Sequence, residues 1–329
     1  MKLGMTPFSR CVLFGVCASV SQLSVAQATF PTKPIRLIAP SSAGGPVDVI
    51  ARIVAQGWSE VLGEQIVIDN RAGAAGMIGA ELVARAAPDG YTLLLGFSGP
   101  LVIVPQINAA TPYDVLKDFA PISLAASAPY VLLVHPSVPA KSVKELVVLA
   151  KAQPGKLNFS SGGTGTGIHM AGELFKLAAG VQIVHVPYKG AGPGMTALIA
   201  GEVNMMFNGL SPALPHIKSE KLRALAVGGD KRSPLVPDLP TVSESGFQFN
   251  TSGWYGVLAP RNTPQPVIAR LHSSLVRALN IPHVKERLRE IAVEVNASTP
   301  EAFSGRLREE MATWGKVVNA AGLKGMQVN

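Results

Sequence analysis

The sequence has few cysteines, few aromatic side chains and few charges. Of its 329 residues, two are cysteines, 6% are aromatic and 15% are charged. Cys11 and Cys17 both lie among the first 28 residues, so the rest of the chain has no disulfide, thiol nucleophile or thiolate metal site. The basic residues are scattered with few aromatics among them, which argues against a nucleic-acid-binding surface. No segment after residue 28 is long and apolar enough to span a bilayer.

The first 28 residues have the pattern of a secretory signal. Lys2 and Arg10 make a basic start, Cys11 to Val20 is a short apolar run, and Ala26-Gln27-Ala28 fits the small-residue cleavage pattern. We expect cleavage after about Ala28 and a soluble protein in an exported compartment. The alternative, a membrane anchor, is disfavoured because the apolar run is shorter than the ~20 residues that a bilayer requires. Removal of the leader lowers the formal charge from +8 to +6.

The usual motifs of enzymes are missing. The chain has no His-Glu-x-x-His, no phosphate loop ending in Gly-Lys-Ser/Thr and no Gly-x-Ser-x-Gly elbow. Around Ser98, Gly96-Phe97-Ser98-Gly99-Pro100 has proline where the elbow needs its last glycine. Gly192-Pro193-Gly194-Met195-Thr196-Ala197 fits the loose dinucleotide pattern, but it does not follow a strand tightly. We predict no catalytic residue and no cofactor.

The six histidines show no spacing typical of a metal site, so we predict no metal. His169 lies just after a glycine-rich loop, in the first turn of an expected helix. It either faces a ligand or closes a local hydrogen bond, and both alternatives stay open at this point. For the other five histidines, a structural role is the simpler interpretation.

The first third of the chain alternates between strands and helices. Strands are expected at residues 35–40, 65–69 and 91–97, with amphipathic helices starting near Val47 and near Ile78. Residues 98–121 contain four prolines and are expected to be irregular. This alternation predicts a mainly parallel sheet with helices on its faces and a binding site beyond the carboxyl ends of the strands.

The alternation starts again near residue 122. Strands are expected at 122–125, 130–134, 157–160, 182–186, 203–207, 222–227 and 254–259. Helices are expected after Ser142, which forms a capping box with Glu145, then over 168–177 and 195–200. The last 65 or so residues are expected to be helical over 264–279, 282–291 and from Thr299 onwards, and to return to the first lobe.

Two loops of small residues follow strands at matching places in the two halves. Ser41 to Gly45 precedes the first helix, and Ser160 to Thr166 precedes the helix that carries His169. The unpaired N–H groups of a helix start, bared by small residues, attract a carboxylate or a phosphate. Glycines that only permit tight turns are the alternative. Because both loops occur in matched positions, we predict a two-lobed clamp for an anion.

Eight short motifs are spread along nearly the whole chain. They are Pro31-x-Lys33-Pro34-Ile35, Ala43-Gly44-Gly45-x-x-Asp48, Asn70-Arg71-x-Gly73-Ala74-x-Gly76, Pro88-Asp89-Gly90-Tyr91-Thr92, Tyr113-Asp114-x-x-Lys117-Asp118-Phe119-Ala120-Pro121, Pro154-Gly155-Lys156-Leu157, His185-Val186-Pro187-Tyr188-Lys189-Gly190 and Pro240-Thr241-Val242-x-Glu244-x-Gly246, with Trp254 and Gly256. Together these motifs resemble those of the Bug family, the TctC-like periplasmic receptors of tripartite tricarboxylate transport systems.

The resemblance implies a type II (Venus-flytrap) α/β fold and a periplasmic receptor that closes on a small carboxylate for uptake or sensing. The implied lobes are residues 29–125 with 251–329, and residues 126–250. A permease or sensor is the implied partner, and a monomer without nucleic acid is expected. The alternatives are an exported enzyme that uses a hydroxyl of Ser160, Ser161 or Thr164, and an interaction protein without a small ligand.

The expected ligand-binding residues come from both lobes, and Asp48 is expected to order the first helix start. They are Ser41, Ser42, Ala43, Gly44, Gly45, Ser160, Ser161, Thr164, Gly165, Thr166, His169, Tyr188 and Asn208. Ser41 replaces an aromatic residue that is usual in the family, and Asn204 and Asn208 stand where acids are common. A cleft without that ring and with fewer acids suits a larger or differently shaped ligand than the usual small dicarboxylate.

Overall fold

The computed structural model describes residues 30–326 except 42 and 189, together with residue 1. The predicted leader beyond Met1, and Ser42 of the first loop, therefore lie outside the described residues. No helix in the described part of the chain is long and apolar enough to cross a membrane.

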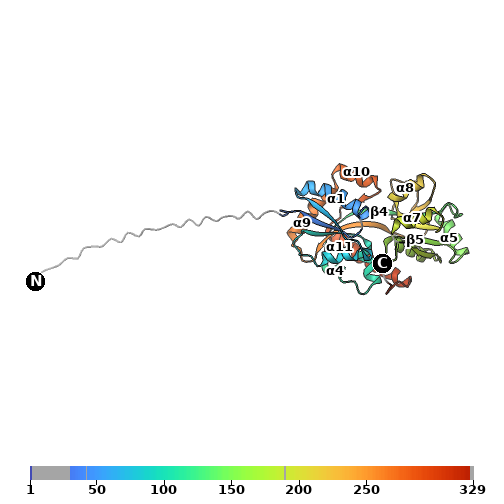
Figure 1. Cartoon of the computed structure of the whole chain (residues 1–329), viewed down its shortest axis with the longest axis horizontal. Helices are drawn as coiled ribbons and strands as arrows, with labels where there is room; N and C mark the ends of the chain where they lie inside the picture. The colour runs from blue at the N-terminus through green and yellow to red at the C-terminus, as the bar shows by residue number, and fades with distance from the viewer. Residues whose placement is uncertain (2–29, 42, 189, 327–329) are drawn as a thin grey trace.

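One long strand, β4 (Phe119–Val134), is shared by two sheets and joins two lobes (Figure 1). Its first part, up to Pro129, pairs antiparallel with β9 in the first sheet. From Tyr130 onwards it pairs antiparallel with β7 and β8 in the second sheet. The chain therefore crosses between the lobes within a continuous strand, and it returns through residues 228–251 to β9.

The first lobe has the strand order β2-β1-β3-β9-β4, in which β1 pairs parallel with β2 and β3. Its strands are β1 (Ile35–Ala39), β2 (Ile66–Asn70), β3 (Thr92–Gly96), β9 (Ser252–Pro260) and the short β10 (Glu294–Val295). Its helices are α1 (Pro46–Leu62), η1 (Ala74–Gly76), α2 (Met77–Ala84), the π-helical turn η2 (Gly99–Ile103), α3 (Val104–Ile107), α4 (Val115–Asp118), α9 (Gln265–Leu279), α10 (Pro282–Glu290) and α11 (Pro300–Ala320).

The second lobe has the order β6-β5-β7-β4, with β8 also paired to β4. Here β5 pairs parallel with β6 and β7. Its strands are β5 (Asn158–Ser161), β6 (Val184–Pro187), β7 (Met205–Gly209) and β8 (Arg223–Val227), and its helices are α5 (Val143–Ala152), α6 (Gly167–Ala179), α7 (Ala191–Ile199) and α8 (Leu210–Lys218).

Each sheet is covered on both faces by apolar helix faces. In the first lobe α1, α9 and α10 pack on one face around the buried Trp58, while α2 and α11 pack on the other around Trp254 and Phe303. In the second lobe α5 and α6 pack around Phe159 and Phe207, and α7 and α8 pack around Met206. Met170 of α6 also joins the core of α11, so the two lobes are in contact there.

The predicted two-lobed α/β architecture is confirmed. Helices α9, α10 and α11 pack on the first sheet. Four details differ from the predictions. The strands expected at 122–125 and 130–134 are one strand, and η2, α3 and α4 occupy the segment expected to be irregular. Residues 210–218, for which no element was predicted, form helix α8. Strands β4 and β9 also add antiparallel pairs that the strand-helix alternation did not indicate.

Candidate functional site

A cleft of about 880 Å³ opens between the lobes and is lined by residues of both. The start of α1 contributes Gly44 to Val47, and η2 begins beside Ser98. The second lobe contributes the starts of α6, α7 and α8. The paired strands add Ala128 and Tyr130 from β4, and Gly253 to Tyr255 from β9.

Helix starts from both lobes point their unpaired backbone donors at this cleft. The N-cap residues of α1, α7 and α8 are Gly45, Gly190 and Gly209, and none of these helices has a side-chain cap. Helix α6 does have one, because the Thr166 hydroxyl accepts a hydrogen bond from His169 N–H at 3.3 Å. The first N–H groups of a helix carry a partial positive charge. Glycine caps leave these groups bare, which suits an anion.

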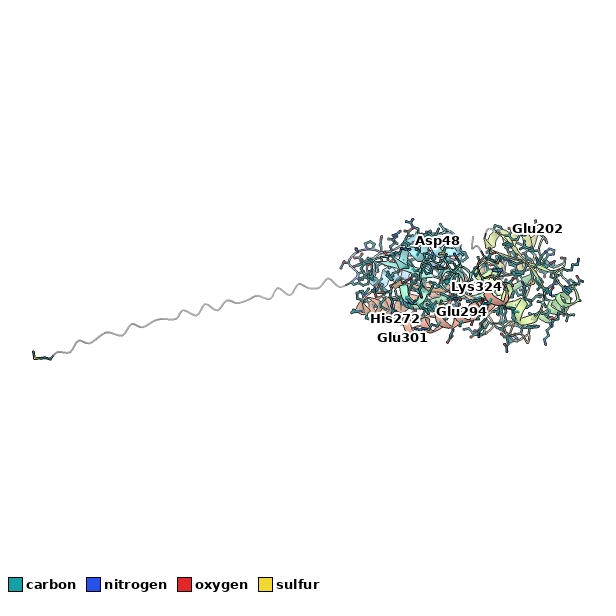
Figure 2. All side chains as sticks on the ribbon, turned by 90° about the horizontal axis from the view of Figure 1, so that it is seen from below. Asp48, Glu202, His272, Glu294, Glu301 and Lys324 are labelled. Atoms are coloured by element: carbon teal, nitrogen blue, oxygen red, sulfur yellow. The ribbon has the colours of Figure 1, made fainter. Side chains whose placement is uncertain are left out.

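The Asp48 carboxylate accepts a hydrogen bond from one backbone N–H group of the first loop. Its Oδ2 accepts hydrogen bonds from Gly44 N–H at 2.8 Å and from Arg52 Nε at 3.1 Å, and its side chain is almost fully buried on the first lobe (Figure 2). Burial would raise the pKa of Asp48, but the Arg52 side chain and Gly44 N–H lower it below its ordinary value. The ionised carboxylate of Asp48 therefore orders the first loop through Gly44 N–H. The N–H groups at the start of α1, after Gly44, stay available to a ligand.

The cleft walls are mostly apolar. The apolar residues of the lining include Val47 and Val49 of α1, Met195 and Ile199 of α7, and also Ile291 and Val293. Among the described lining residues, the titratable side chains are His216, Tyr130 and Tyr255, and none is a lysine, arginine or carboxylate. Burial raises the pKa of both tyrosines, that of Tyr255 to about 12, so they remain neutral donors.

The structure places four of the expected ligand-binding residues on the lining: Gly44, Gly45, Thr166 and Asn208. Ser41 and Ala43 belong to the same first loop, where Ser41 N–H donates to Ala39 O and Ser41 O accepts from the Asn70 amide. Ser42 lies outside the described residues. The contacts of all these residues with a ligand stay a prediction.

The remaining expected residues lie in or behind the second loop. Ser160 is buried and donates to Gly194 O at 3.0 Å. Ser161 is also buried, with its Oγ 2.6 Å from His185 Nε2 and 3.1 Å from Gly163 N. Gly165 and Thr164 form the turn before α6, and Tyr188 packs beside α7 in the second-lobe core. None of these is among the described residues that line the cleft.

His169 closes a local hydrogen bond. Its side chain is 1% exposed, and its Nδ1 accepts from Gly165 N–H at 3.3 Å. Its ring lies 4.0 Å from that of His185. Burial, the neighbouring His185 and Lys176 lower the pKa of His169 to about 3, and burial and Lys176 lower that of His185 to about 4. Both rings are therefore neutral, and they support the second loop from behind.

Sequence reasoning missed several lining residues. Ser98 was considered only as a nucleophile, although its place after strand β3 is where α/β proteins bind ligands. Tyr130 comes from β4, which crosses between the sheets, and Tyr255 from its antiparallel partner β9, and no local pattern signals this arrangement. Ser211 and His216 belong to α8, a helix that was not predicted.

No group of three or more histidine, cysteine or acidic side chains in the described part of the chain could hold a metal ion. The arrangement is instead suited to reversible binding. Two α/β lobes joined by β4 and a return segment, with bare helix starts around a shared cleft, define a two-lobed solute-binding protein.

Comparison with known proteins identifies the family. The family model described as "Tripartite tricarboxylate transporter family receptor" matches residues 50–323. The chain therefore belongs to this receptor family.

Relatives and solved structures agree with this assignment. The chain is 38% identical to a protein of the tcbD-tcbE intergenic region of Pseudomonas sp. strain P51, over 94% of this chain and 93% of that protein. It is 37% identical to BugT of Bordetella pertussis, over 90% and 91% of the two chains. The structure of R. palustris Rpa4515 with adipate matches with a TM-score of 0.81 at 35% identity, covering 89% of this chain and 98% of that one. The periplasmic binding protein BugD matches with a TM-score of 0.78 at 34% identity, covering 90% and 99%.

Proposed function

We propose that this chain is a periplasmic receptor that closes its two lobes on an organic carboxylate and delivers it to a membrane permease or a sensor. The observation that carries the proposal is the cleft onto which three helix starts with glycine caps open from both lobes. Related receptors support it, because one contains adipate and another malate.

Binding in such a cleft relies on fixed dipoles. A carboxylate held by helix starts of both lobes is stabilised only when the lobes come together, so its binding free energy favours closure. Strand β4 and the return segment 228–251 that leads to β9 are the connections about which the lobes would turn. Closure would also remove water from the cleft and strengthen every interaction between the ligand's charge and the backbone donors.

The direct test is isothermal titration of the mature chain with organic acids that have one, two or three carboxylates. The expected result is saturable binding of at least one acid. A ligand with micromolar affinity at 100-fold excess over its Kd should also raise the free energy of unfolding by about 2.7 kcal/mol. If no acid binds or raises the melting temperature, the receptor proposal is wrong and an interaction protein without a small ligand is favoured.

An enzyme remains the second alternative, and one contact is relevant to it. Ser161 Oγ and His185 Nε2 are 2.6 Å apart, as in a hydroxyl nucleophile with its base. Ser161 is fully buried, however, and its Oγ also contacts the backbone of Gly163, so the pair stabilises the loop. Mass analysis of any bound acid after long incubation distinguishes the two functions, because a receptor returns the acid unchanged.

A further inference from the structure

Asn208 has a largely buried side chain, and only one of its two polar groups forms a hydrogen bond with the described part of the protein. It is the next-to-last residue of β7, the central strand of the second lobe, and it is 4% exposed although it lines the cleft. Its Oδ1 accepts a 2.8 Å hydrogen bond from Gly209 N–H. This contact fixes the orientation of the amide, because a backbone N–H must face the oxygen.

The Nδ2 amide group of Asn208 is consequently the half that can serve a ligand. Among the described residues, no hydrogen bond joins this group to the protein, and it is not one of the buried atoms without a partner, so it reaches the surface of the cleft. A bound acceptor oxygen there takes the place of water. Gly209 is also the N-cap of α8, so the Asn208 amide and the α8 helix start offer donors at one place.

The side chains in the rest of the cleft offer little to a second charge. Its walls carry Val47, Val49, Met195, Ile199, Ile291 and Val293, and the described lining residues include no lysine or arginine. Burial of an apolar ligand against such walls makes the binding free energy more favourable by about 0.8 kcal/mol for each methylene group. Burial of an unpaired carboxylate there makes binding less favourable.

We propose that this cleft selects organic acids that place one carboxylate against the Asn208 amide and that carry an apolar chain or ring instead of a second charge. This inference rests on the proposed receptor function and narrows its ligand class. The Asn208 amide acts as a specificity determinant. Its N–H group donates a hydrogen bond to the ligand's carboxylate, whereas an acidic side chain at position 208 would repel that carboxylate.

The first test compares acids of equal carbon number by isothermal titration. Hexanoate should bind more tightly than adipate, and affinity should rise about 3- to 4-fold for each methylene group from butanoate to hexanoate. Tighter binding of adipate than of hexanoate would overturn the inference and leave the receptor function intact. Failure of every acid would overturn both. Lys189 lies outside the described residues, so a preference for adipate that the Lys189→Ala variant loses would assign the second charge to Lys189 and also overturn the inference.

The second test exchanges the amide for a carboxylate of the same shape. Asn208→Asp keeps the oxygen that accepts from Gly209 N–H but replaces the donor, so hexanoate affinity should fall at least 10-fold. Asn204→Asp is the matched control, because Asn204 carries an equivalent amide whose oxygen accepts from Asn158 N–H, outside the described lining of the cleft. The control adds the same charge and should leave affinity within 2-fold of wild type. Equal effects of the two substitutions, or none from Asn208→Asp, would remove Asn208 from the binding site.

Discussion

At the scale of single residues, a substitution of Gly45 tests most directly whether the first loop binds the ligand. Gly44 has a φ of +78°, so any side chain there strains the backbone. Gly45 has φ −76° and ψ 168°, an extended conformation that every residue adopts and that the following proline favours. Gly45 lines the cleft, so a side chain at this position is added at the cleft without backbone strain.

We predict that Gly45→Leu abolishes carboxylate binding while the free energy of unfolding changes by less than about 1 kcal/mol. Titration calorimetry and urea unfolding measure the two effects separately. Gly305→Leu is the control, because Gly305 lies in α11 with no atom within 4 Å of an added Cβ. Parallel losses of stability and binding in Gly45→Leu would show that this glycine serves the fold and not the ligand.

The buried histidine pair gives the protein a definite pH dependence. The folded-state pKa values of about 3 for His169 and about 4 for His185 lie below the ordinary value of 6.5. As the pH falls below 6.5, these two histidines therefore bind protons in the unfolded chain but not in the folded chain. Stability is complete above pH 6.5 and falls as the pH drops towards 4, with a slope of up to about 1.4 kcal/mol per pH unit for each histidine.

We expect His169→Gln to flatten this slope between pH 7 and pH 5, as measured by urea unfolding in that range. If His169→Gln and the wild type lose stability in parallel from pH 7 to pH 5, His169 is not held neutral by its surroundings.

Residue types alone predicted part of the site. The glycines of the first loop were visible as small residues between a strand and a helix, and Asn208 was named among the expected ligand-binding residues. Tyr130 and Tyr255 were not visible, because their place in the cleft depends on β4, which crosses from one sheet to the other, and on its pairing with β9. Ser160 and Ser161 had the right chemistry in the sequence, but the backbone of the loop and His185 hold their hydroxyls.

At the scale of elements, helix α11 contacts strand β9 at Gly256. An added Cβ at Gly256 would lie 2.1 Å from the Phe303 ring, which is fully buried and packs edge-on against Trp254. Only glycine allows the helix to approach this closely, and the approach fixes α11 against the strand that pairs with β4.

Gly256→Ala should therefore destabilise the protein by about 1–3 kcal/mol through overpacking. Thermal and urea unfolding would measure the change. The double variant Gly256→Ala with Phe303→Leu should lose less stability than the two single variants together, because the smaller side chain makes room. Additive losses in this double-mutant cycle would contradict direct contact as the cause.

Most elements followed from local patterns, and the exceptions have physical causes. The capped helices were the clearest: Ser142 and Thr299 accept hydrogen bonds from the N–H groups of Glu145 and Ala302, as their positions predicted. Strand β4 was predicted as two pieces because Pro129 interrupts its pattern, yet proline fits where β4 leaves one sheet for the other. Helix α8 tolerates Pro212 in its first turn.

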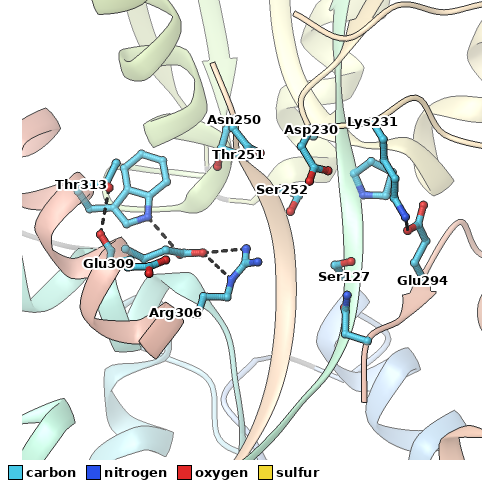
Figure 3. Close-up of a pocket in the computed structure, with 15 residues that line it drawn as sticks. Ser127, Asp230, Lys231, Asn250, Thr251, Ser252, Glu294, Arg306, Glu309 and Thr313 are labelled. Carbon is cyan, nitrogen blue, oxygen red and sulfur yellow. Dashed lines mark hydrogen bonds and ion pairs between the residues drawn. The ribbon is translucent and has the colours of Figure 1, made fainter. Parts of the chain in front are cut away.

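At the scale of the whole molecule, the two faces of the crossing strand β4 have opposite surroundings. Side chains alternate along a strand, so Ala128 and Tyr130 face the cleft while Ser127 and Pro129 line a separate polar cavity of about 380 Å³ on the other face (Figure 3). That cavity also has walls from both lobes, with Asp230 and Lys231 on one side and Arg306 and Glu309 on the other. Rotation that closes the cleft should therefore widen the cavity behind it.

One ion pair joins the lobes across this rear cavity. Lys231 Nζ, which follows β8 in the second lobe, lies 3.1 Å from Glu294 Oε2 in β10 of the first lobe, and hydrogen bonding to Glu294 raises the pKa of Lys231 (Figure 3). The pair is largely exposed, so it contributes no more than about 1 kcal/mol. Since closure would stretch the pair, it favours the open arrangement of the lobes.

We predict that Lys231→Gln raises ligand affinity by up to about 5-fold at low ionic strength, because closure no longer breaks the ion pair. Calorimetry in 10 mM and 500 mM salt measures this effect, which should fade at high salt as the pair is screened in the wild type too. Arg289→Gln removes the same charge from a pair with Glu286 inside α10, so its affinity should match the wild type. Weaker binding by Lys231→Gln at low salt would show that the pair favours the closed state, and the lobes would then turn about a different axis.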